Sequence, residues 1–218
     1  MTKLSFTNKL LIAGAGATFV FAASPSQAVV INPTNFTGWQ SVGNVSLSDQ
    51  GASLSSTVGV SDTDIETFLG LDAGALDSIN FEDATNGSAI KNTFTVESGD
   101  VLTFDWRFQT SDYLPYNDFS FYSIGSSVSK LADVQQVGDY GNTTSQTSYT
   151  FTTAGTYTVG FGVVNSRDTA VNSNLNVGVV PDGVVPEPIT ILGSLTAGAF
   201  GVVLRRKQKQ QQQATSKV

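Results

Sequence analysis

Four side chains that end in an oxygen-bearing group lie within a short stretch of the sequence, namely Asp105, Asp112, Asn117 and Asp118. Carboxylate and amide oxygens suit a hard cation such as Ca2+, which takes about six to eight oxygen ligands. Their spacing matches neither the EF-hand loop nor a glycine-rich calcium repeat, and Asn and Asp often cap the backbone of turns. The sequence therefore leaves two hypotheses for these residues, a Ca2+ site and a capped turn.

Three tyrosines lie in or just after the same segment, Tyr113, Tyr116 and Tyr122, and Tyr140 follows further along the chain. Exposed aromatic rings can stack on sugar rings, which is how neutral glycans are usually bound. The same tyrosines could instead fold inward and anchor a long loop. We predict a glycan-contacting surface at Tyr113, Tyr116 and Tyr122, with the inward-folded loop as the alternative.

The chain contains no Cys and no His. It therefore has no disulfide, no thiolate nucleophile and no Ser-His-Asp triad, and it lacks the most common zinc ligand. Catalysis by carboxylates alone stays open, as in glycosidases, and it would need Asp105 to face Asp112 or Asp118 across a cleft. We predict that the protein is not an enzyme, with a carboxylate-based glycan hydrolase as the alternative.

The central part of the chain is strongly acidic. Residues 29–185 contain four Lys and Arg against 17 Asp and Glu, which gives a net charge of −13. An acidic surface repels nucleic acid phosphates and anionic lipid headgroups, whereas it is compatible with divalent cations and neutral glycans. We therefore expect no nucleic acid partner.

Alternating apolar and polar residues predict several strands. The clearest run is Leu102–Gln109, where every second side chain is apolar, and similar patterns surround Phe94 and span Tyr157–Val163. Weaker candidates are 39–47, 52–60, 118–124, 148–153 and 175–180. This number of short strands predicts an all-β fold, a jelly-roll-like two-sheet β-sandwich with one or two short helices.

Two segments break the strand pattern. Ile65 and Leu69 are four residues apart, acidic residues precede them and Gly70 follows, which predicts a short helix over 61–70. A second turn of helix is expected over 73–79. We expect both to cap one edge or end of the sandwich.

The first 28 residues have the three regions of a secretory signal peptide. Lys3 and Lys9 precede an apolar run over 10–23, and small residues at Ser26 and Ala28 define a cleavage site for signal peptidase after Ala28. The run is too short to span a bilayer comfortably.

The C-terminal segment has a second set of features. Pro186, Glu187 and Pro188 precede an apolar stretch over 189–204, and Arg205 and Arg206 begin a basic cluster. Sixteen residues of helix span about 24 Å, enough for a short membrane anchor. The basic cluster places the central domain outside the cytoplasmic membrane, in agreement with the signal peptide.

This order of Pro-Glu-Pro, apolar helix and basic cluster over 185–209 resembles the PEP-CTERM sorting tail, also called the ice-binding protein C-terminal motif. The resemblance implies recognition by an exosortase, a membrane enzyme that acts near the Pro-Glu-Pro and transfers or releases the domain. A plain tail-anchored helix is the alternative.

The central region carries weaker resemblances. Gly38 and Trp39 open it like the first strand of jelly-roll modules of the carbohydrate-binding type. The segments around Phe104–Trp106, Tyr116–Phe119 and Gly160–Val164 resemble a recurring extracellular domain that often precedes PEP-CTERM tails. These resemblances support fold and location more than activity.

Together the predictions divide the chain into a signal peptide (1–28), an extracytoplasmic β-sandwich (29–184), a PEP-CTERM sorting signal (185–209) and a cytoplasmic tail (210–218). We expect an exported protein, anchored in the cytoplasmic membrane before processing and then found at the cell surface or in the extracellular matrix. Its expected role is non-enzymatic binding of a glycan, exopolysaccharide or matrix, and a purely structural surface subunit is a further alternative.

Overall fold

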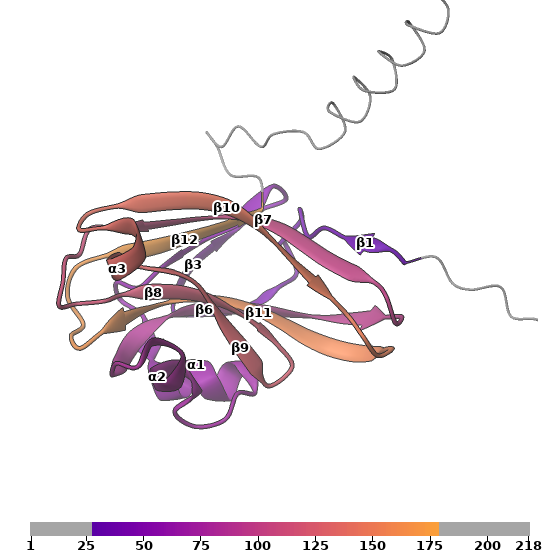
Figure 1. The fold of residues 1–218 in the computed structure, drawn as a ribbon, viewed down its shortest axis with the longest axis horizontal. Helices are drawn as coiled ribbons and strands as arrows, with labels where there is room; N and C mark the ends of the chain where they lie inside the picture. The colour runs from indigo at the N-terminus through magenta and orange to yellow at the C-terminus, as the bar shows by residue number, and fades with distance from the viewer. Residues whose placement is uncertain (1–27, 179–218) are drawn as a thin grey trace, which may run out of the picture.

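The structure, a computed structural model, describes residues 28–178, which form two six-stranded sheets packed face to face (Figure 1). The first sheet, sheet A, consists of β1 (Val30–Ile31), β3 (Asn44–Leu47), β4 (Gly51–Ser55), β7 (Val101–Thr110), β10 (Asn142–Thr150) and β12 (Ser173–Gly178). The second sheet, sheet B, consists of β2 (Gln40–Val42), β5 (Val60–Ser61), β6 (Ala84–Val96), β8 (Phe119–Ile124), β9 (Ser127–Asp133) and β11 (Gly155–Ser166). The predicted all-β sandwich is confirmed.

The chain passes back and forth between the two sheets. In sheet A the order is β3-β4-β12-β7, and both β10 and β1 also pair with β7. In sheet B the order is β2-β6-β11-β8-β9, with β5 beside β6. Most neighbouring strands are thus distant in sequence, whereas the pairs β3–β4 and β8–β9 follow each other directly along the chain.

The main core lies between the sheets and follows from the alternation along each strand. On β7 the even-numbered side chains Leu102, Phe104 and Phe108 are fully buried, whereas the odd-numbered ones face outward. Phe104 packs edge-on against Phe161 of β11, with 4.7 Å between the ring centroids. Aromatic contacts between the inner faces of β7 and β11 therefore join the two sheets.

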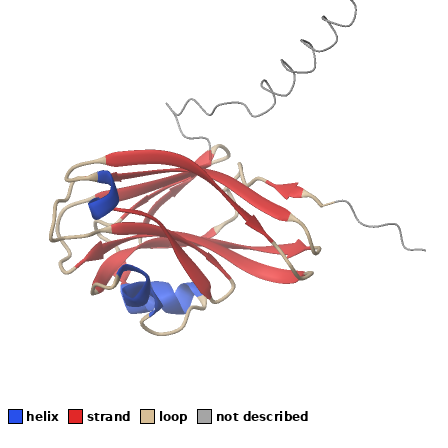
Figure 2. Ribbon diagram, viewed as in Figure 1, coloured by secondary structure: helices blue, strands red, loops and turns tan. Residues whose placement is uncertain are grey.

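A second core covers the outer face of sheet B. Helices α1 (Asp62–Leu69) and α2 (Ala75–Asn80) bury Ile65, Leu69 and Leu76 against this face, and Figure 2 shows both helices below the lower sheet. The two predicted helices are present, but their expected position was wrong. They cover a face of the sheet because β8 and β11 present apolar side chains on both of their faces.

Local sequence explains where α1 begins and ends. The Ser61 side chain accepts a hydrogen bond from the Asp64 backbone N–H (3.1 Å), and Gly70 ends the helix at φ 76°. Glu66 is buried and accepts hydrogen bonds from the backbone N–H groups of Gly74 and Leu76. That carboxylate ties α1 to the start of α2.

The first described residues pair with the N-terminal end of β7. Strand β1 pairs in parallel with Val101 and Leu102 of β7. The Val29 backbone N–H donates to Asp100 Oδ1 (2.8 Å), and this bond together with one from Glu97 N–H lowers the pKa of Asp100. Predicted cleavage after Ala28 would turn the Val29 nitrogen into an ammonium group facing this carboxylate.

We therefore expect Asp100→Asn to lower the melting temperature more in the chain that begins at Val29 than in the chain that retains Ala28. Only the former loses an ion pair as well as a hydrogen bond. Melting temperatures of the four combinations at pH 7 measure the difference. An equal loss in both chains would show that the ammonium group does not interact with Asp100.

Candidate functional site

The loops at one end of the sandwich carry most of the large apolar side chains that are exposed. Within residues 28–178, eight large apolar side chains are exposed, and six belong to these loops: Val58, Phe81, Tyr113, Leu114, Tyr140 and Val171. Ala28 and Gly178, where the described chain begins and ends, lie at the opposite end of the strands. We call the end that carries these loops the loop end, and the end where Ala28 and Gly178 lie the chain-terminal end.

Three tyrosine rings gather at the loop end. The centroids of Tyr113 and Tyr116 are 5.7 Å apart with nearly perpendicular planes, and those of Tyr113 and Tyr140 are 5.9 Å apart. Tyr113 is 43% exposed and Tyr140 is 64% exposed. The rings therefore form an exposed aromatic cluster from two loops that are far apart in sequence.

Hydrogen bonds donated by backbone N–H groups hold these two loops together. The Tyr140 N–H donates to the Asp112 carbonyl oxygen (2.8 Å), and the Leu114 N–H donates to Asp139 Oδ1 (3.1 Å). Because hydrogen bonds join the two loops, the positions of Tyr113 and Tyr140 are coupled.

Two of the predicted site residues lie elsewhere. Tyr122 is on the inner face of β8, edge-on to Phe104 with centroids 5.5 Å apart, so it belongs to the core and does not join the tyrosine cluster. Asp105 is on the outer face of β7, where its Oδ1 accepts a hydrogen bond from the Gln146 side chain (2.9 Å). The strand alternation that the sequence displays could have separated Asp105 from the loop residues.

Asp118 lies in a polar layer that closes the core at the loop end. It is fully buried at the start of β8. Its Oδ1 accepts from the Ser166 backbone N–H (3.0 Å) and its Oδ2 from the Ser173 hydroxyl (2.7 Å). Ser173 Oγ also lies 2.8 Å from Thr110 Oγ1, so the layer links β7, β8, β11 and β12.

Burial raises the pKa of Asp118 to about 7. The two hydrogen bonds oppose this shift, and the negative charges of Asp112 and Asp168 add to it. Burial, with the charge of Asp168, also raises the pKa of Asp112. Asp112 Oδ1 accepts from the Tyr113 N–H (2.8 Å), while Oδ2 is buried and has no hydrogen-bond partner among the described residues.

Asn117 extends this polar layer toward α2 and β9, because Ser166, whose N–H donates to Asp118, also donates its hydroxyl to the Asn117 backbone oxygen (3.0 Å). Its Oδ1 accepts from the Gln135 N–H (2.8 Å), and its backbone oxygen accepts from the Asn80 side chain (2.7 Å). Lys130 forms an ion pair with Asp133 and donates to Asn80 Oδ1 (3.0 Å). These bonds fasten α2 and β9 to the loop that leads into β8, so Asn117 has a structural role in this geometry.

The four predicted metal ligands are thus not gathered around one point. Within residues 28–178, no group of three or more His, Cys, Asp or Glu side chains is arranged so that it could hold a metal ion. Asp112 and Asp118 lie near each other, Asn117 uses its oxygens internally and Asp105 faces away. The geometry favours the capped-turn hypothesis over Ca2+ binding.

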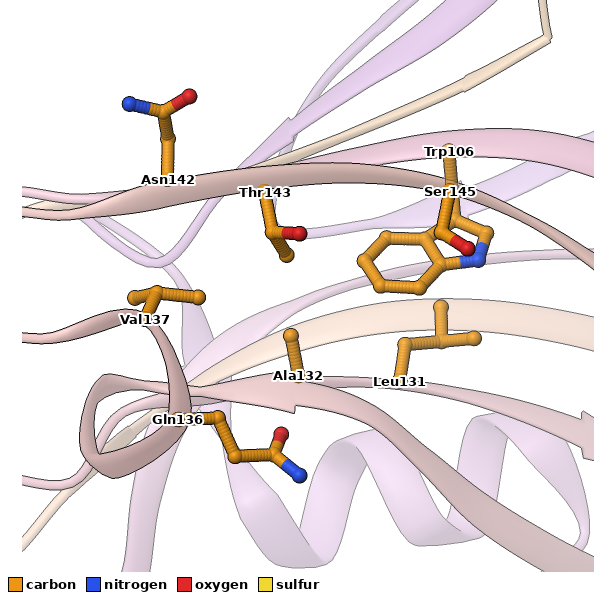
Figure 3. Close-up of a pocket in the computed structure, with 8 residues that line it drawn as sticks. All are labelled: Trp106, Leu131, Ala132, Gln136, Val137, Asn142, Thr143 and Ser145. Atoms are coloured by element: carbon orange, nitrogen blue, oxygen red, sulfur yellow. The ribbon is translucent and has the colours of Figure 1, made fainter. Parts of the chain in front are cut away.

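A cleft of about 440 Å³ opens between the free edges of the two sheets (Figure 3). Its lining contains no charged side chain and comprises Trp106, Leu131, Ala132, Gln136, Val137, Asn142, Thr143 and Ser145. Trp106 is only 5% exposed, and its indole N–H donates to the Thr147 hydroxyl (2.8 Å). The indole is therefore a wall of the cleft rather than an open stacking surface.

The residues predicted to direct processing lie at or beyond the limits of the described chain. Ala28 is its first residue and is exposed. Pro186, Glu187, Pro188, Arg205 and Arg206 lie outside the described residues, as does the apolar stretch 189–204. Among residues 28–178 no helix is long and apolar enough to cross a membrane.

A family model described as the PEP-CTERM protein-sorting motif matches residues 184–207, which include all five of these C-terminal residues. The chain therefore carries a PEP-CTERM sorting motif. The motif implies export, C-terminal membrane anchoring before processing, and processing by an exosortase. No curated protein matches the chain.

The raised pKa of Asp118 makes a pH dependence testable. An Asp carboxyl has a pKa of about 3.9 in an unfolded chain, so between that value and about 7 the folded state binds more protons than the unfolded state. This group therefore makes the free energy of unfolding fall as the pH rises from about 4 to about 7. Asp118→Asn should reduce the loss of stability between pH 5 and pH 8, measured by urea unfolding.

Asp49→Asn, at an exposed carboxylate, is the matched control and should keep the wild-type pH dependence. An unchanged dependence in Asp118→Asn would contradict the assignment of this effect to Asp118.

Proposed function

We propose that the exported domain is a non-enzymatic binding module for a neutral glycan of the cell surface or exopolysaccharide, where it resides after exosortase processing. The observation that carries the proposal is the cluster of Tyr113, Tyr116 and Tyr140, in which Tyr113 and Tyr140 are exposed and Tyr116 is half-buried. Rings that differ in orientation can contact successive faces of a sugar chain, and tyrosine hydroxyls supply hydrogen bonds at the rim.

The charge of the domain favours a neutral ligand. The acidic side chains outnumber the basic ones by 13 over residues 29–185, so an anionic polysaccharide would be repelled. Asp139 is exposed in the same loop as Tyr140. A sugar hydroxyl can donate a hydrogen bond to this carboxylate, whereas a uronic acid or sulfate group would meet like charge.

The positions of the carboxylates support a binding role over hydrolysis. A glycosidase needs two carboxylates on either side of the scissile bond, separated by about 5–10 Å and open to the substrate. Asp112 and Asp118 are fully buried, and Asp105 is on the outer face of sheet A. The pair required by the hydrolase alternative is thus not formed in this geometry.

The location of the tyrosine cluster also suits a tethered protein. Gly178 leaves the sandwich at the chain-terminal end, and the sorting motif follows from residue 184. The loop end is therefore directed away from the anchor while the tail holds the protein at the membrane. The cluster stays accessible to a glycan before and after the tail is removed.

The test is retention of the purified mature protein on neutral polysaccharide prepared from its own host. Tyr113→Ala combined with Tyr140→Ala should weaken binding at least about tenfold, which corresponds to a combined loss of about 1.4 kcal/mol from two aromatic contacts of a type that is enriched among binding hot spots. Both side chains are exposed, so the melting temperature should change little. Repeating the measurement in Ca2+ and in EDTA tests the calcium hypothesis separately, and equal binding would count against a bound ion.

Phe81→Ala is the matched control. Phe81 is 92% exposed at the same end of the sandwich but is not part of the tyrosine cluster, so its loss should leave binding unchanged. If wild type binds no host polysaccharide under either condition, or if the double variant binds as wild type does, the proposed function is wrong.

A further inference from the structure

Strand β10 is the edge of sheet A and is open to a further partner. Among the described residues it pairs only with β7, in one uninterrupted register from Asn142 opposite Gln109 to Thr150 opposite Val101. All nine residues are therefore regular strand on one side, and their outward N–H and C=O groups face no other strand. Such an edge is a template for pairing with another chain.

The other sheet edges carry features that discourage pairing. The opposite edge of sheet A is β3, which has only four residues. In sheet B one edge is divided between β2 and β5, of three and two residues, and the other is β9, which has a register shift and contains Lys130. Short strands, bulges and lysines are the usual protections of an edge, and β10 has none of them.

The segment that contains β10 also has an unusual charge distribution. No charged residue occurs from Tyr140 to Ser166, although the domain around it is strongly acidic. Two copies that approach through most other surfaces would bring carboxylates together. At β10 they meet only Asn, Thr, Ser, Gln and Tyr side chains, so like charge does not oppose the contact at this strand.

There is room beside this edge. The cleft of about 440 Å³ separates the first half of β10 from β9 and the short helix α3 (Val134–Val137), as Figure 3 shows. The side chains of Thr144, Gln146 and Ser148 are exposed. In this region no other part of residues 28–178 covers the strand.

We propose that two copies of this chain associate through their β10 strands, which pair antiparallel about a twofold axis and join the two A sheets into one. In the register centred on Gln146, this residue faces its own copy and Thr144 faces Ser148 of the other chain. Cross-strand pairs of Thr and Ser are favourable, and the contact is self-complementary as twofold symmetry requires.

This association goes beyond the proposed glycan binding and does not depend on it. Because the paired strands run in opposite directions, the two loop ends point away from each other. If the tyrosine clusters bind glycan, one dimer carries two binding ends on opposite sides and can connect two glycan chains.

The test is sedimentation velocity of the mature protein over a range of concentrations. Wild type should form a reversible dimer. Thr144→Lys combined with Ser148→Lys places like charges opposite each other and should raise the dissociation constant at least about tenfold. The pair Thr144→Glu and Ser148→Glu should do the same, and an equal mixture of the two variants should restore a mixed dimer.

Thr95→Lys combined with Ser53→Lys is the matched control, since it adds the same charge at exposed strand positions away from β10 and should leave the dimer intact. Hydrogen exchange of the wild-type protein gives a second measurement without substitutions, in which the β10 amides should gain protection as concentration rises. A monomeric wild type, including one whose β10 carries a covalent glycan, would overturn the proposal. So would a Thr144→Lys, Ser148→Lys variant that dimerises as wild type does.

Discussion

Strand β11 is buried on both faces, and the rest of the sandwich is arranged around this constraint. Its residues from Val159 to Ser166 are all buried or nearly so, with one face against sheet A and the other against α1. Such close packing requires glycine at two positions, Gly87 on the neighbouring strand β6 and Gly162 on β11 itself. A Cβ on Gly87 would collide with the Val163 carbonyl oxygen, and a Cβ on Gly162 would collide with the Phe121 ring. The outer face of sheet B is apolar as well, and α1 and α2 shield it from solvent.

The end of β11 connects this packing to the candidate site. There the apolar core gives way to the polar layer, in which Asp118 receives hydrogen bonds from Ser166 and Ser173. A buried carboxyl is costly unless it is paired, and here its two hydrogen bonds fix the start of β8 and hence the loop that carries Tyr113 and Tyr116. The exposed aromatic cluster is therefore positioned by buried polar contacts directly beneath it.

The sequence was most informative where one face of a strand is buried. The alternation along β7 predicted its bounds to within a residue at each end, and the spacing of Ile65 and Leu69 before Gly70 predicted α1. Strand β10 was predicted only at its last residues. Its inward-facing side chains beside the open cleft are polar, namely Thr143, Ser145 and Thr147, so the sequence has no alternation of apolar and polar residues there. The alternation along β7 could have separated Asp105 from Asp118. Strand β8 is buried on both faces, so its sequence shows no alternation that would place Tyr122 in the core.

A PEP-CTERM motif follows a sandwich whose tyrosine cluster lies away from both ends of the described chain. We infer that this domain reaches its working location after cleavage at both ends. Mass spectrometry of the mature protein from its own host tests that claim most directly. We expect an N-terminus at Val29 and a C-terminus near Pro186 to Pro188. A chain that extends intact through Val218 would contradict it and would leave a plain membrane-anchored protein.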